Sequence, residues 1–323
     1  MRVRALVLLT ALLAAVTVLP TPTAQASTFF SGTYSNSQGS RYYEGFVPTS
    51  YRAGTPMPLV VGLHGCTQEA EDIRTASRFN TLAESRGFLV VYPQQTTFAN
   101  SARCWNWMLS GNQSRGYGEP SIIAGITNLV KANYTIDPKR VFVFGFSAGG
   151  AMTAIMGATY PDLYAAGAVH AGCEYDGYPC GSSGGPSPTT SGNAAYTAMG
   201  SYKRVVPMQV WHGTSDTTVY PINGNQVLSQ WAQTNDRAYD GLDDNDIDDV
   251  ADTTAKLSVS GGRTYTKYSY KNSATGAVVM EKLMIDGMGH SYSGGCSCEF
   301  YTDPYGPDAT TMSYNFFTAN PKP

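Results

Sequence analysis

Charged side chains are scarce in this sequence. Asp, Glu, Lys and Arg make up 14% of its 323 residues, and the formal net charge at pH 7 is -3. Proteins that bind nucleic acid usually present a dense basic surface, and 21 Lys and Arg against 24 Asp and Glu leave no basic surplus. We therefore expect no nucleic-acid partner.

Long apolar runs are also missing, except at the N-terminus. Residues 5–19 form an apolar run behind two arginines, and Ala24-Gln25-Ala26 supplies the small residues that signal peptidase accepts. The run is shorter than the ~20 residues that a membrane span needs. We predict that residues 1–26 are a signal peptide and that residues 27–323 are secreted and extracellular, without a membrane anchor. An uncleaved anchor is the alternative.

The sequence lacks any Cys-x-x-Cys pair, and its single Cys-x-Cys has no partner pair at zinc-ligand spacing. We therefore expect no metal site at the cysteines. In an exported chain an even number of cysteines predicts disulfides. Six cysteines allow 15 pairings, so the pairing stays open at this point. The cysteines are Cys66, Cys104, Cys173, Cys180, Cys296 and Cys298.

Short apolar runs alternate with helical patterns along the rest of the chain. We expect strands at residues 42–47, 58–63, 88–92, 141–144, 165–170, 206–211 and 278–285. We expect helices at residues 69–85, 119–131, 148–159 and 225–234. Strands that alternate with helices indicate an α/β fold with a mostly parallel sheet and helices on both faces. No second core follows, so we predict a single domain over residues 27–323.

The pentapeptide Gly145-Phe146-Ser147-Ala148-Gly149 lies between a predicted strand and a predicted helix. A nucleophile elbow needs this arrangement, because the serine stands on a sharp turn where side chains on the flanking residues would clash. Ser147 is thus the candidate nucleophile. An ordinary tight turn is the alternative.

Histidine is rare, which leaves few candidates for the base that must activate a serine. His290 follows the last predicted strand, where the chain order serine, acid, histidine of α/β hydrolases places the base. Asp216 follows the strand 206–211 and is the candidate acid. Asp286 is the rival, although it would have to fold back sharply onto His290. Structural roles are expected for the other histidines, which are His64, His170 and His212.

A second motif, His64-Gly65-Cys66-Thr67-Gln68, follows the strand 58–63. The same fold places one oxyanion-hole donor after an early strand and the other directly after the nucleophile. The backbone N–H groups of Cys66 and Ala148 are therefore the candidate oxyanion hole. A plain strand-to-helix turn is the alternative.

Six motifs stand together in one order along the chain. The motifs are HGCTQ at 64–68, CWNW at 104–107, RGYGE at 115–119, GFSAGGAMT at 145–153, WHG at 211–213 and GMGH at 287–290. With them the chain closely resembles the catalytic domain of secreted poly(3-hydroxybutyrate) depolymerases, a group that is similar in turn to bacterial feruloyl and acetylxylan esterases. The resemblance implies an α/β-hydrolase fold, a triad of Ser147, Asp216 and His290, and Cys66 as an oxyanion donor.

The resemblance also implies a disulfide between Cys66 and Cys104. Such a bond would pin the oxyanion loop to the segment that carries Trp105, which we predict to bind substrate, with a buried core position as the alternative. A bond between Cys173 and Cys180 is favoured because both lie in one loop. Cys296 and Cys298 would close a small strained ring, so cross-pairing between the two loops stays open.

These residues predict a serine carboxylesterase that works through an acyl-enzyme. The resemblance implies an aliphatic polyester such as poly(3-hydroxybutyrate) as its substrate. The chemistry needs no metal or organic cofactor, and we expect a monomer. A feruloyl or acetylxylan esterase is the main alternative. A peptidase, a lipase or a non-catalytic binding module on the same fold would be further ones.

Two features differ from the polymer-degrading pattern. The chain ends soon after His290, so we expect no separate substrate-binding domain. The stretch 240–252 is rich in aspartate, and Asp244, Asp246 and Asp248 alternate as calcium-loop ligands do. The glycine and distal glutamate of an EF-hand loop are missing, so a solvated acidic loop is expected, with calcium as the alternative.

Overall fold

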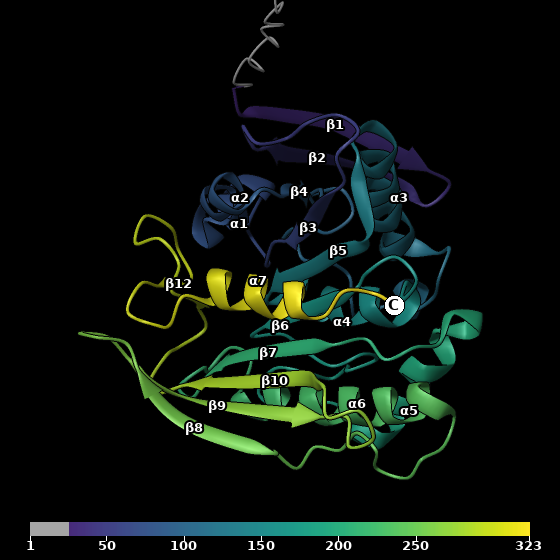
Figure 1. The fold of residues 1–323 in the computed structure, drawn as a ribbon, viewed down its shortest axis with the longest axis vertical. Coiled ribbons are helices and arrows are strands. Elements are labelled where there is room, and N and C mark those ends of the chain that lie inside the picture. The colour runs from purple at the N-terminus through teal and green to yellow at the C-terminus, as the bar shows by residue number, and fades with distance from the viewer. Residues whose placement is uncertain (1–25) are drawn as a thin grey trace, which may run out of the picture.

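A ten-stranded sheet forms the centre of the molecule in the computed structural model, which describes residues 26–323 (Figure 1). The predicted signal peptide, residues 1–26, lies outside the described residues apart from its last one. Strand order across the sheet is β1-β2-β4-β3-β5-β6-β7-β10-β9-β8. The strands of this sheet are β1 (Thr28–Asn36), β2 (Gly39–Val47), β3 (Met57–Leu63), β4 (Leu89–Pro93), β5 (Ile136–Phe146), β6 (Ala166–His170), β7 (Met208–Gly213), β8 (Thr253–Ser258), β9 (Thr264–Lys271) and β10 (Val278–Ile285). A separate two-stranded sheet pairs β11 (Tyr292–Ser293) with β12 (Thr302–Asp303).

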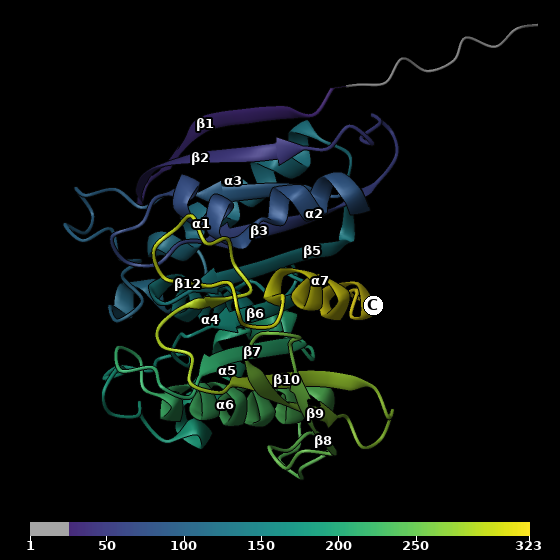
Figure 2. The same ribbon diagram turned by 90° about the vertical axis from the view of Figure 1, so that its left-hand side faces the viewer.

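Six neighbouring strands, from β4 to β10, pair in parallel, and the strands outside them pair antiparallel. The parallel strands are the continuous apolar runs of the sequence, because helices cover them on both faces. Leu59, Val60 and Val61 in β3 are fully buried, for example. The loops that follow these strands all leave the same edge of the sheet and gather on the left-hand side of Figure 2.

Helices pack on both faces of the sheet. α3, α4, α5 and α6 enclose one core with the sheet, and α1, α2 and α7 enclose the other. Their bounds are α1 (Ala70–Ser77), α2 (Phe79–Arg86), α3 (Gly118–Asn133), α4 (Ala148–Thr159), α5 (Pro188–Ala198), α6 (Pro221–Asp240) and α7 (Ala309–Ala319), with short 3-10 helices η1 (Ser110–Asn112) and η2 (Gly200–Tyr202). Within residues 26–323, no helix has both the length and the apolar character that a bilayer crossing needs.

The architecture confirms the predicted α/β class, and one local expectation is corrected. The single helix expected at 69–85 is two helices, because Arg78 adopts a left-handed backbone with φ of 56°. Its guanidinium donates to the Gly294 carbonyl, and the turn points Phe79 into the core.

Candidate active site

Ser147 stands on the turn between β5 and α4, at the edge of the sheet where the loops gather. Its φ of 57° and ψ of -120° are unusual for a residue with a side chain, and such conformations cost about 1–3 kcal/mol. The flanking glycines make the turn possible. A Cβ on Gly145 would lie 2.1 Å from the Gly149 carbonyl oxygen, and one on Gly149 would lie 2.1 Å from that of Leu63.

The structure brings His290 and Asp216 to this serine. His290 Nε2 lies 2.9 Å from Ser147 Oγ, and His290 Nδ1 lies 2.8 Å from Asp216 Oδ2. Asp216 occupies the loop after β7, and His290 the loop after β10. Strand pairing therefore places the three side chains together from distant parts of the sequence. An aspartate on one ring nitrogen and a serine on the other is the geometry that general-base activation requires.

The environment of Asp216 keeps its carboxylate charged. Burial would raise the pKa of this group, but the hydrogen bond to His290 and the N–H groups of Val219 and Thr218 lower it below the ordinary value. Both N–H groups donate to Oδ1 at 2.9 Å. Oδ2 is thereby left to face the imidazole, where a negative charge stabilises the protonated ring.

The rival acid lies away from His290, and His212 and His170 make contacts of their own, although His212 Nε2 also lies 3.5 Å from Asp216 Oδ2. Asp286 pairs with Lys256 and Thr264 at the surface, so it does not face His290. His212 bonds to the Val219 carbonyl at 2.7 Å, and burial lowers its pKa. His170 stacks between aromatic rings in the core, where burial lowers its pKa to about 3.

The backbone N–H groups of Cys66 and Ala148 flank the serine. Cys66 lines the same hollow as Ser147, and Ala148 is the first residue of α4. Within residues 26–323, neither group donates to a backbone carbonyl outside the regular helices and strands, whereas the N–H of Thr67 is taken up by the Ala102 carbonyl. The two donors are therefore available to a developing negative charge, as an oxyanion hole requires.

A hollow of about 170 Å³ opens over the serine. It is lined by Cys66, Thr67, Phe146, Ser147, Thr218, His290 and Tyr301. Tyr301 stands on the loop between β11 and β12, with its ring centroid 6.2 Å from that of His290. We did not predict Tyr301 from the sequence, because it lies in a loop without periodicity or motif.

The prediction that Trp105 lines the cleft is wrong. Its side chain is 0% exposed and packs in the core under α3, with its ring centroid 5.5 Å from that of His64. A large indole gains more free energy from full burial than from lining an open cleft. The segment next to Cys104 therefore turns inward, and Trp105 packs against His64 at the start of the oxyanion loop.

All six cysteines are paired, and the bond at Cys66 holds a loop that lines the hollow. The pairs are Cys66–Cys104, Cys173–Cys180 and Cys296–Cys298. The first agrees with the pairing that the resemblance implied, and the second with the pairing favoured by proximity. The third closes the small ring, so the two loops are not cross-paired.

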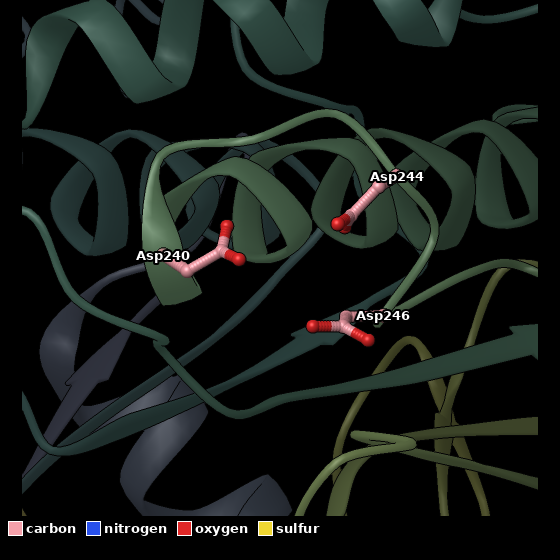
Figure 3. A group of neighbouring side chains, drawn as sticks. All are labelled: Asp240, Asp244 and Asp246. Atoms are coloured by element: carbon pink, nitrogen blue, oxygen red, sulfur yellow. The ribbon is translucent and has the colours of Figure 1, made fainter.

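The aspartate-rich loop lies away from this site, beyond the end of α6. Asp240, Asp244 and Asp246 point toward one another (Figure 3), with carboxylate oxygens within 4.8 Å. Asp248, the third residue of the alternating pattern, accepts the Val250 N–H instead. Because α6 runs back along the sheet from the loop of Asp216, its far end is remote from the elbow.

The parallel sheet, the elbow and the Ser147, His290 and Asp216 arrangement define the class of this protein as an α/β hydrolase. The sequence profile of the esterase PHB depolymerase family matches residues 42–241. The chain therefore belongs to the esterase PHB depolymerase family.

Individual relatives carry different names within this esterase group. The chain is 39% identical over 253 residues to poly(3-hydroxyalkanoate) depolymerase C of Paucimonas lemoignei, covering 76% of this chain and 56% of that one. It is 34% identical over 212 residues to acetylxylan esterase A of Talaromyces purpureogenus, covering 61% and 54% respectively. The chain thus spans little more than half the length of these curated relatives.

A solved structure shares the fold. The acetyl xylan esterase from Aspergillus awamori superimposes with a TM-score of 0.65 at 23% identity, covering 86% of this chain and 94% of that one.

Proposed function

We propose that this chain is a secreted serine carboxylesterase that hydrolyses ester bonds of an aliphatic polyester such as poly(3-hydroxybutyrate). The observation that carries the proposal is the hydrogen-bonded series from Asp216 through His290 to Ser147 beside an open hollow. The 39% identity to a protein named poly(3-hydroxyalkanoate) depolymerase C supports the polyester substrate.

The reaction proceeds by acyl transfer. Ser147 Oγ attacks the ester carbonyl carbon while its proton passes to His290 Nε2, and Asp216 stabilises the imidazolium. The carbonyl oxygen becomes an oxyanion that the N–H groups of Cys66 and Ala148 bind. When the carbon–oxygen bond to the alcohol breaks, the alcohol takes the proton from His290 and an acyl-Ser147 ester remains. Water then repeats the attack with His290 as base, which releases the acid and restores the serine.

The size of the hollow favours a short acyl group. Sites for drug-sized ligands have volumes of about 300–1,000 Å³, and this hollow has about 170 Å³. One hydroxybutyryl unit or an acetyl group suits that volume better than a feruloyl ring with its linker. An acetylxylan esterase is therefore the second candidate, supported by relatives of that name.

The three disulfides support export. Such bonds persist in oxidising compartments outside the cytosol, and all six cysteines form them. The predicted signal peptide at residues 1–26 supplies the route. We propose an extracellular enzyme that acts on polymeric or small ester substrates as a monomer.

The test compares three substrates with wild type and Ser147→Ala. We expect the wild type to clear a suspension of amorphous poly(3-hydroxybutyrate), and the variant to leave it turbid. Release of acetate from acetylated xylan without clearing would favour the second candidate, and release of ferulate from methyl ferulate would point to a wider pocket. Activity that survives in Ser147→Ala would contradict the proposed nucleophile.

A further inference from the structure

His64 lies fully buried at the end of β3 and contacts the oxyanion loop directly. Its Nδ1 lies 2.7 Å from the Gly65 carbonyl oxygen, and its Nε2 lies 2.9 Å from the Gln95 backbone nitrogen. A carbonyl oxygen only accepts hydrogen bonds, and a backbone N–H only donates them. The two contacts therefore require a neutral ring that carries its proton on Nδ1.

The carbonyl that His64 holds belongs to the same peptide unit as the N–H of Cys66. A trans peptide is planar, so its C=O and N–H point in opposite directions. The imidazole lies on the buried side, against Trp105, whereas Cys66 lines the hollow with Ser147. Holding the carbonyl toward the core therefore aims the Cys66 N–H toward the serine.

The neighbouring peptide units are held as well. The Gly65 N–H donates to Gln68 Oε1 at 2.8 Å, and the Thr67 N–H donates to the Ala102 carbonyl at 2.6 Å. The Gly65 carbonyl oxygen also accepts the Gln68 N–H at 3.4 Å, so the His64 bond at 2.7 Å is the shorter of the two contacts that orient the peptide between Gly65 and Cys66. Glycine offers little resistance to rotation there, because it lacks a Cβ.

Gln95, which fixes the tautomer of His64, is itself fixed by a buried polar network. Its side-chain amide donates to the Cys104 carbonyl at 2.9 Å and to the Glu119 carboxylate. Glu119 also accepts from Arg41 at 3.1 Å and from the Asn106 N–H at 2.7 Å. The network thus connects the buried Arg41–Glu119 ion pair to both ends of the disulfide. It reaches Cys104 through its carbonyl, and it reaches the loop of Cys66 through His64.

We propose that His64 is a positioning residue, which holds the Gly65 carbonyl in the core and thereby aims the Cys66 N–H at the oxyanion. This inference rests on the proposed serine-esterase function. Burial lowers the pKa of His64 to about 4, so the ring stays neutral at the pH at which a serine esterase works. The residue acts through a backbone group and never touches the substrate.

The first experiment compares His64→Leu with His64→Asn on p-nitrophenyl butyrate. Leucine fills the site without a donor, whereas asparagine places an amide nitrogen near the position of Nδ1. Loss of one oxyanion donor lowers kcat by about 100- to 1,000-fold in a well-studied protease. We expect a misaimed donor in His64→Leu to lower kcat by about 10- to 100-fold with little change in KM, and His64→Asn to recover most of that loss.

A boronic acid that forms a tetrahedral adduct with Ser147 provides a second readout. Its affinity should fall in His64→Leu by the same factor as kcat, because the adduct presents an oxygen to the Cys66 N–H. Thr127→Val is the matched control, since it removes a buried hydrogen bond to Tyr164 far from the hollow. It should lower the melting temperature but leave kcat unchanged.

Two results would overturn the proposal. One is a folded His64→Leu that keeps kcat within about threefold of wild type, or that loses no more than His64→Asn. The other needs no variant: ¹⁵N NMR of the wild type should show the proton on Nδ1 of His64, and a proton on Nε2 would contradict the geometry. Loss of all activity in Ser147→Ala, measured in parallel, separates failure of this inference from failure of the proposed function.

Discussion

At the scale of single residues, a substitution at Asp216 can remove the negative charge of the side chain and keep its shape. Asp216→Asn keeps the volume but removes the negative charge opposite the imidazolium and disturbs the tautomer of His290. We expect kcat on p-nitrophenyl butyrate to fall by about 10³- to 10⁴-fold. Asp286→Asn is the matched control, because Asp286 pairs with Lys256 at the surface. Equal activity of the two variants would mean that Asp216 is not the acid of the triad.

Glu174 carries the clearest pH dependence in the fold. Its side chain is 3% exposed, and neither carboxylate oxygen has a hydrogen-bond partner within the described chain. Burial, together with the negative charge of Asp176, raises its pKa from 4.5 to about 8. Between these two values the unfolded chain has lost the proton and the folded chain still holds it, so stability falls as the pH rises.

Glu174→Gln should remove this dependence. We expect the difference in unfolding free energy between variant and wild type to shift in favour of the variant by about 1.4 kcal/mol per pH unit across that window. The difference should level off above the folded-state pKa. Urea unfolding of both proteins at pH 5 and pH 9 measures it. Parallel pH profiles would show that the carboxyl group is ionised or solvated in the folded protein.

At the scale of elements, the sequence predicts best where most side chains of an element are buried. α4 and β10 have the predicted bounds. A run of small residues in α4 and an apolar run in β10 indicate one type of element each, and clear stop signals mark their ends. We did not predict β1, β8, β9, α5 or α7. β8 is exposed along its whole length and exists through its pairing with β9, so its polar sequence contains no burial signal.

The candidate site likewise contains some features that the sequence predicts and others that it does not. The elbow and the acid and base loops follow from motif and chain order, since the fold places them at fixed points of the sheet. The inward turn of Trp105 and the position of Tyr301 depend on how loops fold over one another. Local sequence does not encode that packing.

The loop between β11 and β12 therefore offers a test of acyl specificity. Tyr301 lines the hollow together with Thr218 and contacts the His290 ring, and Tyr301→Ala would extend the hollow. We expect kcat/KM for p-nitrophenyl octanoate relative to butyrate to rise about tenfold, because pockets discriminate single methylenes by about 1–3 kcal/mol. Tyr305→Ala, at an exposed tyrosine that follows β12 and does not line the hollow, should leave the ratio unchanged. An unchanged ratio in Tyr301→Ala would place the acyl group elsewhere.

At the scale of the whole molecule, the site depends on both halves of the sheet. Ser147 and the oxyanion loop follow β5 and β3, whereas Asp216 and His290 follow β7 and β10. Helix α7 crosses between these halves and contacts β5, β6 and β7. Its residues Tyr314 and Phe317 stack on Phe88 and Phe142, with centroid distances of 4.1 and 5.0 Å. The helix thus joins the strands that carry the two parts of the site.

Phe317→Ala tests whether sheet and site unfold as one unit. Phe317 is fully buried, so its truncation should cost about 3–5 kcal/mol through lost burial and a cavity. We expect a melting temperature lower by roughly 10 °C and an unchanged kcat at 25 °C, since the helix lies away from the hollow. Activity and tryptophan fluorescence should be lost in the same transition, because both report the same sheet. Phe300→Ala, at a position 86% exposed, should leave the transition unchanged. Loss of activity well below the fluorescence transition would instead mean that the loops of the site melt independently of the sheet.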